Sequence, residues 1–383
     1  MSEQTIDLGI AGGGPAGSMA AIEAARSGLK VALWERGSFP RDKVCGEFLS
    51  PEALPLLRQV IPGAIYRSVT IRRAEFCSKG GRRHSIGFPA PGAGLSRRVL
   101  DHALWQAAAG AGACCHSHEA LLGAARQSPG RDSGWDVIAG TGKAASASRF
   151  IVACGRWWKL TGLPSPAAPD SRQRACGWLG AKAHFKGVDA SDAVEMYFFP
   201  GGYCGLAPVE DGAYNACCLV HRSLAESCRG GDFADFRVWI SKVARHPALN
   251  SRLYKAVQVS PTLSTAPVNP ARQIADSSGI LIAGDAAGFL DPFTGDGISM
   301  ALHSGQLAAR QLVSGLKHRG SLRPACLYRR QFSQSVRRSY LCAALLRTIV
   351  RAPAELQDWL TAAMPSFLAS RLLSETRWRD KLR

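Results

Sequence analysis

The sequence predicts an α/β protein with a Rossmann-like dinucleotide-binding domain, an interleaved antiparallel β-sheet domain and C-terminal helices. Three observations support this fold class. An apolar run near the N-terminus leads into a glycine-rich turn and an alanine-rich helix, and a second glycine–acid segment follows late in the chain. Between them lie stretches in which apolar and polar residues alternate. A chain of 383 residues also exceeds the usual size of a single hydrophobic core, so two domains are expected.

The first element is a predicted strand, residues 6–11, followed by a tight turn into a helix. The turn consists of Gly12, Gly13, Gly14, Pro15, Ala16 and Gly17. Gly12 permits the turn, Gly14 lets the backbone approach a pyrophosphate, and Gly17 lets the helix pack closely on the strand. The helix N-terminus offers unpaired amides and a positive dipole to phosphate. These features predict a dinucleotide cradle.

The second strand, residues 30–34, ends in Glu35, which Arg36 follows. Glu35 stands 35 − 12 = 23 residues after the first glycine, close to the spacing at which an acid binds a ribose 2′-hydroxyl. A carboxylate there favours an unphosphorylated adenosine ribose, as in FAD or NAD. We therefore include Glu35 and Arg36 among the predicted cofactor contacts.

The late segment 279–298 indicates which dinucleotide is bound. A strand runs into Gly284-Asp285, and the predicted contacts beyond it are Pro292, Gly295, Gly297 and Ile298. With the N-terminal turn holding a pyrophosphate, Asp285 can accept a hydrogen bond from a ribityl hydroxyl. The turn at Gly295 and Gly297 opens a helix whose amides can face the pyrimidine edge of an isoalloxazine and stabilise reduced flavin. The cofactor predicted is noncovalent FAD.

Here the sequence resembles a known family. Gly284-Asp285 with Pro292 is similar to the second FAD fingerprint of the flavoprotein group that contains aromatic hydroxylases, geranylgeranyl reductase-like enzymes and flavin-dependent halogenases. Residues 40–47, with Cys45 and Gly46, resemble the segment after the ribose acid in geranylgeranyl reductase-like members. The resemblance also implies that Arg97 opens a helix beside the FAD and that residues 195–206 form strands over the flavin.

Two departures from the family pattern bear on function. Hydroxylases usually carry an Asp-Gly pair where this chain has Ala153, Cys154, Gly155 and Arg156. The acid associated with nicotinamide handling is therefore missing, although NAD(P)H stays the expected electron donor. The Trp-x-Trp-x-Ile-Pro segment of tryptophan halogenases is also absent from the sequence, which makes halogenation a minor alternative.

The predicted domains are discontinuous. The FAD-binding domain comprises residues 1–70, 90–165 and 265–325; the substrate-binding domain comprises 71–89 and 166–264; a basic helical region covers 326–383. The alternating stretches 69–89 and 176–220 are broken by Gly-Gly and Asp-Gly pairs, which are hairpin signals. We expect them to form an antiparallel sheet over the flavin, with the substrate between sheet and isoalloxazine.

Composition is that of a globular enzyme. Apolar residues make up 46% and charged residues 20% of the chain, which argues against extensive disorder. The twelve cysteines show no CxxC spacing, so no metal site is predicted. The N-terminus carries no export signal, and no apolar run reaches the roughly 18 to 20 residues that cross a bilayer. We expect a cytoplasmic protein with reduced thiols.

The charge distribution suggests possible partners. The net charge is +18, and residues 310–383 hold 15 Lys or Arg against 4 acids, which leaves 15 − 4 = +11 there. Such a surface suits an anionic membrane, giving peripheral association, or an acidic carrier domain. We favour a solvated helical face over such a partner, because a basic bias alone identifies no binding partner. No nucleic-acid motif is present, and no nucleic-acid partner is predicted.

Catalytic side chains are harder to assign, because an oxygenating flavin carries most of its own chemistry. The amides at Gly295 and Gly297 are the first candidates, for an electrostatic role. Glu47, Tyr203 and Cys204 are further candidates, since their segments are expected to line the flavin. The alternatives are a packed apolar role for Cys45 and Cys204 and an arginine-partner role for Glu47.

The function predicted from these residues is an NAD(P)H-dependent monooxygenase that hydroxylates a lipophilic or phenolic small molecule. The first alternative is a geranylgeranyl reductase-like C=C reductase, as residues 43–47 imply. A reductase also needs a proton donor, and the sequence neighbours of Glu47, Tyr203 and Cys204 mark none of them as one. A halogenase and a flavin-binding protein without turnover are minor alternatives.

We predict that the purified chain is yellow and that denaturation releases FAD, because both glycine segments converge on one dinucleotide. Chromatography of the released flavin checks this. Release of FMN, or of no flavin, would contradict the assignment.

Overall fold

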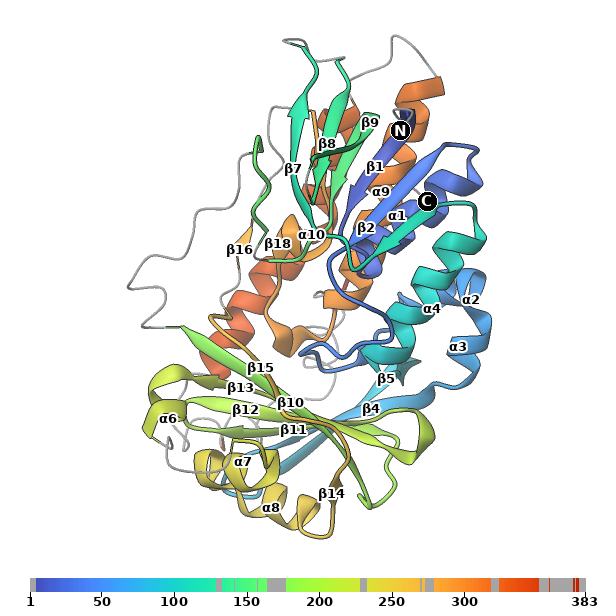
Figure 1. The fold of residues 1–383 in the computed structure, drawn as a ribbon. Coiled ribbons are helices and arrows are strands. Elements are labelled where there is room, and N and C mark those ends of the chain that lie inside the picture. Colours follow the sequence, from blue (N-terminus) through green and yellow to red (C-terminus); the bar gives the residue numbers. More distant parts are fainter. Residues whose placement is uncertain are drawn as a thin grey trace.

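The computed structural model confirms the predicted α/β fold class (Figure 1). It describes residues 5–128, 133–140, 142–156, 158–163, 177–227, 233–268, 271–272, 279–317, 324–350, 358, 375 and 377–378. The predicted boundary at 165/166 and Cys176 lie outside these residues.

The first sheet is built around parallel strands. Its order is β6 (Cys114–Ser117), β2 (Val31–Glu35), β1 (Thr5–Ala11), β9 (Gly142–Val152), β8 (Trp135–Ala139) and β7 (Leu121–Arg126), with β17 (Leu281–Ile282) also paired to β9. Every residue of β2 is buried, as expected of a parallel strand covered on both faces. Ala11 pairs with Trp34 and with Val152, so β1, β2 and β9 end at one edge, where such sheets bind ligands.

Three helices position this edge: α1 (Pro15–Arg26), α4 (Arg97–Gly110) and α9 (Gly297–Lys317). Proline suits the first turn of α1, where its missing N–H is not needed. Helix α9 packs so closely on α1 that a Cβ at Gly305 would lie 2.1 Å from the carbonyl oxygen of Ala16. The two glycine segments are thereby brought side by side.

The second sheet lies below the first in Figure 1. Its order is β14 (Val257–Gln258), β10 (Trp178–Lys186), β13 (Tyr214–His221), β12 (Gly202–Pro208), β11 (Ala193–Phe199), β4 (Val69–Cys77), β5 (Arg83–Gly94) and β3 (Phe48–Leu49), with β15 (Leu263–Thr265) also paired to β10. All neighbours are antiparallel except β11 and β4. Strand β5 runs past the predicted domain boundary at residue 89, and β3 joins this sheet from the segment assigned to the first domain.

The two faces of the second sheet have different partners. Tyr197 and Cys204 belong to a cluster with residues of α7 (Phe236–Ala244) and α8 (Pro247–Leu253). Their neighbours Phe198 and Tyr203 point to the opposite face, as strand geometry requires, and pack with Phe293. This second face therefore covers the segment that follows Gly284-Asp285. We call it the inner face.

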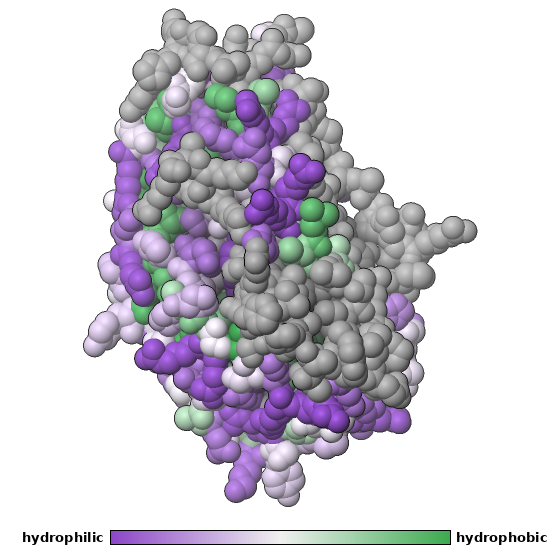
Figure 2. Space-filling model, turned by 180° about the vertical axis from the view of Figure 1, so that it is seen from behind, coloured by the Kyte–Doolittle hydropathy of each residue, from purple (hydrophilic) through white to green (hydrophobic). Residues whose placement is uncertain are grey.

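The remaining elements are short, apart from one long helix. They are α2 (Leu54–Val60), α3 (Pro62–Tyr66), α6 (Arg222–Ser227), β16 (Ala271–Arg272), β18 (Gly288–Phe289) and α10 (Pro324–Val350). Within the described residues, no helix combines the length and the apolar character needed to span a membrane. Figure 2 shows hydrophilic residues over much of the described surface seen from behind.

Candidate functional site

The N-terminal turn has the geometry of a pyrophosphate cradle. Gly12 has φ +100°, and a Cβ there would lie 2.5 Å from the carbonyl oxygen of Ala153. A Cβ at Gly17 would lie 1.8 Å from the carbonyl oxygen of Gly12. At Gly14, the N-cap of α1, a Cβ would meet no protein atom within 4 Å. The open space beside amides at a helix N-terminus fits the pyrophosphate of FAD.

Glu35 is held beside this turn by the backbone. Its Oε2 accepts a hydrogen bond from the amide of Gly13 at 2.9 Å, and its Oε1 accepts from the amide of Gly37 at 3.1 Å and from Arg41 Nη1 at 2.5 Å. Burial raises the pKa of Glu35, but Arg41 and the two amides outweigh it and lower the pKa to about 2. A carboxylate offers about four acceptor sites, and three are used here. The fourth suits a ribose hydroxyl.

Arg97 brings a buried positive charge to the start of α4. Its Nε and Nη2 each donate to the carboxylate of Asp101 at 2.7 Å. Burial lowers the pKa of Arg97, but the charge and hydrogen bonds of Asp101, helped by Cys45, raise it overall. Cys45 is half-buried and its carbonyl oxygen accepts from Asn215 Nδ2 at 2.9 Å. The predicted contacts Cys45 and Arg97 thus adjoin.

Asp285 lies in the same charged neighbourhood. Burial raises the pKa of its carboxyl, and the positive charges of Arg156 and Arg97 act in the opposite direction. The preceding residue, Gly284, donates its amide to Ser304 Oγ of α9 at 2.9 Å. The geometry leaves Asp285 as a candidate for the ribityl contact, with Arg156 as a neighbour that sequence reasoning treated only as a departure from the family.

The second glycine turn places a carboxylate that the sequence did not single out. Gly295 has φ +64°, a conformation that disfavours other residues, and Gly297 begins α9. Between them, Asp296 is 1% exposed and accepts hydrogen bonds from Ser50 Oγ at 3.0 Å and from the amide of Trp378 at 2.9 Å. The turn is therefore tied to the end of the chain.

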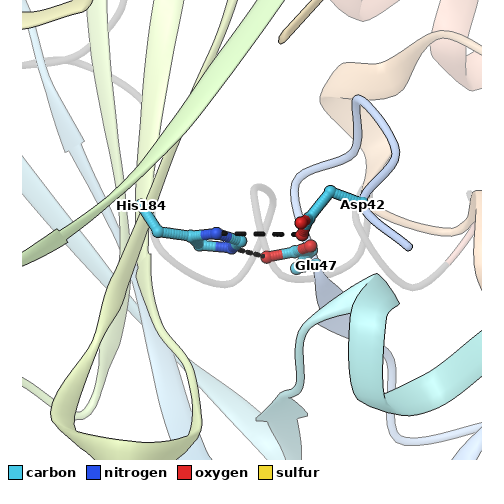
Figure 3. A group of neighbouring side chains, drawn as sticks. All are labelled: Asp42, Glu47 and His184. Carbon is cyan, nitrogen blue, oxygen red and sulfur yellow. Dashed lines mark hydrogen bonds and ion pairs between the residues drawn. The ribbon is translucent and has the colours of Figure 1, made fainter. Parts of the chain in front are cut away.

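A buried charged network joins the two sheets (Figure 3). Glu47 Oε1 accepts from Lys182 Nζ at 2.5 Å and from the amide of Arg97 at 2.8 Å, while Glu47 Oε2 lies 2.6 Å from His184 Nε2. Asp42 Oδ1 lies 3.8 Å from Lys182 Nζ and 4.0 Å from His184 Nδ1. In Figure 3 the histidine reaches from β10 toward two acids on the loop after β2.

The network holds Glu47 in an unusual state. The residue is fully buried, and its φ of +58° is in the left-handed region, which costs free energy for a residue with a side chain. Burial raises the pKa of Glu47, yet the hydrogen bond from His184 and the charge of Lys182 lower it overall. Glu47 is thus an ionised acceptor, so Nε2 of His184 carries the proton between them.

Ligand atoms of Asp42, Glu47 and His184 lie within 4.8 Å of one another, as in a metal site. Lys182, however, is also fully buried and within hydrogen-bond distance of Glu47. Its ammonium supplies the positive charge that a cation would bring. The group is therefore better described as an acid–base network.

Sequence reasoning identified Glu47 but missed Lys182 and His184. The signal was present in β10, where Gly180, Lys182 and His184 alternate with Ala181, Ala183 and Phe185. The apolar set packs toward α7 and α8, which leaves the polar set on the inner face. Alternation predicts the two faces, but only the fold shows that the polar one is buried.

The other two predicted catalytic side chains, Tyr203 and Cys204, lie on opposite faces of the second sheet. Tyr203 lies on the inner face against Phe293 and is 5% exposed. Cys204 points the other way, into the cluster beside α7 and α8, and burial raises the pKa of its thiol. The structure contradicts a site role for Cys204, because the two-residue period of the strand turns it away from the flavin side.

The remaining predicted contacts differ in their exposure. Ala16 and Ile298 are buried at the starts of α1 and α9, next to Pro15 and Gly297. Exposed residues are Arg36, Gly46, Pro292 and Gly297. Exposure leaves these four positions accessible to a ligand.

Two alanine substitutions in the cradle should separate folding from cofactor binding. Gly17→Ala places a Cβ inside the carbonyl of Gly12 and should destabilise the chain by several kcal/mol. Gly14→Ala meets no protein atom, so it should leave the unfolding free energy of the apoprotein within about 1 kcal/mol and weaken FAD at least tenfold. Denaturant unfolding and FAD titration measure the two effects. Wild-type FAD affinity in Gly14→Ala would contradict the cradle.

Glu35→Gln should destabilise the apoprotein by about 3 kcal/mol at pH 7, because the folded-state pKa is lowered to about 2 from 4.5. A lowered pKa stabilises the fold above the unfolded-state value and loses that effect as pH falls toward 2. The difference between wild type and variant should therefore shrink below pH 4.5. Urea unfolding at pH 7 and pH 3.5 measures it.

Glu23→Gln is the matched control, since Glu23 pairs with a half-exposed arginine at the surface and should change stability by less than about 1 kcal/mol. A pH-independent difference for Glu35→Gln would show that Glu35 is not a depressed carboxylate.

Comparisons with known proteins agree with this geometry. The chain is 29% identical over 325 residues to digeranylgeranylglycerophospholipid reductase 2 of Methanopyrus kandleri, covering 81% of this chain and 78% of that protein. It is 29% identical over 340 residues to menaquinone reductase of Mycobacterium tuberculosis, covering 82% and 78%. No protein-family model matches the chain.

Solved structures show the same fold. A geranylgeranyl bacteriochlorophyll reductase-like protein from Thermoplasma acidophilum has a TM-score of 0.75 at 21% identity, covering 97% of this chain and 96% of that one. A flavin-dependent brominase has a TM-score of 0.76 at 20% identity, covering 98% and 95%. These comparisons confirm the predicted resemblance to the group that contains geranylgeranyl reductase-like enzymes and flavin-dependent halogenases, and they support the assignment of the chain as an FAD-dependent oxidoreductase.

Proposed function

We propose that the protein is an FAD-dependent reductase of carbon–carbon double bonds in an isoprenoid chain. The names of the sequence relatives support a reductase over the monooxygenase that we favoured from sequence. The halogenase likeness is one of fold alone. An isoprenoid is a lipophilic substrate of the kind expected from the sequence. An isoprenoid held in an anionic membrane would also match the positive charge of the basic region 326–383.

The structural observation that supports reduction is the Glu47–His184–Lys182 network. Saturating a double bond adds a hydride to one carbon and a proton to the other, whereas hydroxylation by a flavin needs no such donor. The network places acid–base groups where the loop after β2, which the family resemblance assigns to the flavin, meets the inner face of the second sheet. The network thereby offers a candidate proton donor, which the sequence alone did not mark.

FAD, when bound and reduced, supplies the hydride. His184 is the proposed proton donor, because among Glu47, Lys182 and His184 only the His184 side chain keeps partial exposure, at 11%, beside the ionised Glu47. The Nε2–H stays hydrogen-bonded to Glu47, so the donating form of His184 is the doubly protonated imidazolium, and its second proton, on Nδ1 at the side of Asp42, is the one given to the substrate carbon, which leaves a neutral ring. Lys182 keeps Glu47 charged, and water returns the proton to His184.

The electron donor belongs to the proposal as well. We retain NAD(P)H, although the residues 153–156 lack the acid found in hydroxylases. Reduction of bound FAD by NADH or NADPH under nitrogen tests this separately from substrate turnover.

The test of function is anaerobic turnover of a geranylgeranyl-bearing lipid by chemically reduced enzyme. Each saturated bond should add two hydrogens to the product mass, and FAD should be reoxidised in step. His184→Gln should lower the rate of this step about 10² to 10⁴-fold, as loss of a general acid does, without changing FAD binding. Mass spectrometry and rapid-mixing absorbance provide the readouts.

His221→Gln is the control, because His221 lies at the end of β13 and contacts Ser223; its rate should stay near that of wild type. Turnover that requires dioxygen, with labelled oxygen in the product, would overturn the reductase in favour of the monooxygenase. An undiminished rate in His184→Gln would remove His184 from the mechanism.

A further inference from the structure

The end of the chain is built into the second glycine turn. Arg377 has a side chain only 9% exposed, and its Nη1 donates to the carbonyl oxygens of Thr294 at 3.3 Å and Gly295 at 3.5 Å. The same nitrogen lies 3.7 Å from Asp296 Oδ1. One guanidinium therefore contacts three consecutive residues of the turn.

Trp378 completes the contact through its backbone and its ring. Its amide donates to Asp296 Oδ2 at 2.9 Å, so both oxygens of that carboxylate are bound. Its indole stacks on His303 of α9, with centroids 5.4 Å apart and planes 5° apart, and lies 6.1 Å from Phe332 of α10. The dipeptide is wedged between two helices and cannot shift without moving the turn.

The segment on the other side of the turn is bound as well. Ser50 donates to Asp296 Oδ1, the guanidinium of Arg377 lies over Phe48 at 5.7 Å from its centroid, and a Cβ at Gly295 would lie 3.1 Å from Phe48. Phe48 and Ser50 follow Glu47 directly. Arg377 thus links the glycine turn to the segment that carries the acid–base network.

Glycines on both sides of Asp296 make this turn adaptable in isolation, since glycine gains many backbone conformations in an unrestrained chain. Two carboxylates flank Arg377, since Asp296 Oδ1 lies 3.7 Å from its Nη1 and Glu52 Oε2 lies 4.0 Å from its Nε. The hydrogen bonds from Arg377 to the carbonyl oxygens of the turn fix the direction of the amides at Gly295 and Gly297. Those amides can stabilise negative charge only if they are already oriented.

We propose that Arg377 and Trp378 are positioning residues for the flavin, and that they hold the Gly295–Gly297 turn so that its amides favour the reduced, negatively charged flavin over the oxidised one. This inference rests on the proposed function, because it takes FAD as the ligand of the turn. It adds residues from the end of the chain to a site otherwise assigned to residues 12–298.

The experiment compares the redox states of bound FAD in the full-length protein. In Arg377→Ala, affinity for reduced FAD should fall at least tenfold more than affinity for oxidised FAD, which lowers the two-electron midpoint potential by about 30 mV or more. Arg377→Lys keeps the charge but not the planar fork and should recover part of the loss. Fluorescence titration and anaerobic dye-coupled reduction provide the two measurements.

Arg338→Ala is the matched control, since Arg338 is 63% exposed and pairs with Glu375 of the same terminal stretch without reaching the turn; its potential should equal that of wild type. An unchanged potential in Arg377→Ala overturns the proposal, even if both redox states bind more weakly, because a merely structural role weakens both equally. If Arg377→Ala does not fold, Arg377→Lys decides by the same criterion.

Failure of this inference is distinguishable from failure of the proposed function. If the wild-type enzyme reduces the double bonds of its substrate and the midpoint potential of Arg377→Ala equals that of wild type, only the positioning role is contradicted. If the wild-type enzyme binds FAD but does not reduce double bonds, and Arg377→Ala has a lower midpoint potential than wild type, only the reductase function is contradicted.

Discussion

The buried carboxylate of Glu47 is the constraint on which the junction between the two sheets depends. An ionised group without solvent is costly unless its partners are close and correctly placed. Here one partner is the amide that begins α4, and the other two are side chains of β10 in the second sheet. Moving either sheet would leave a charge unpaired, so the network fixes the register between the cradle and the sheet that covers it.

The same constraint explains the backbone strain at Glu47. A residue with positive φ is tolerated where the surroundings supply more than the strain costs, and three polar contacts to one carboxylate do so. The adjoining Cys45 and Gly46 are then directed toward Arg97 and solvent. Strain, charge and exposure thus coincide on the loop 36–47 between β2 and β3.

Local physics made the cradle predictable. Gly12, Gly17 and Glu35 act on atoms within a single strand–helix–strand unit, so their roles follow from spacing alone. Lys182 meets Glu47 across 135 residues, and no local pattern encodes that pairing. Cys204 failed for a related reason: alternation separates it from Tyr203, but the sequence does not say which face α7 and α8 cover. Asp296 received no predicted role, because its partners Ser50 and Trp378 lie 246 and 82 residues away in the sequence.

These differences bear directly on the choice between oxygenation and reduction. In the sequence analysis, oxygenation required only a water-excluding sheet over the flavin and oriented amides. It therefore needed fewer assumptions than reduction, which also requires a proton donor. The fold supplies a further acid–base group at the junction, which oxygenation leaves unused. The network that fixes the two sheets relative to each other also contains an acid–base group, and the proposed protonation of a substrate carbon would use it. Sequence relatives that are named as reductases support the same proposal.

The site is also assembled from both ends of the chain. The N-terminal glycine turn and Glu35 lie within the first 41 residues together with Arg41, whereas Asp296 is contacted by Arg377 and Trp378 as well as by Ser50. A ligand that bridges the cradle and the Gly295–Gly297 turn binds only a chain in which both ends are docked. By mass action such a ligand stabilises the docked state over partly folded ones. On the proposed binding of FAD at both turns, cofactor affinity and docking of Arg377 and Trp378 are linked, so a change that loosens the docking should weaken FAD binding.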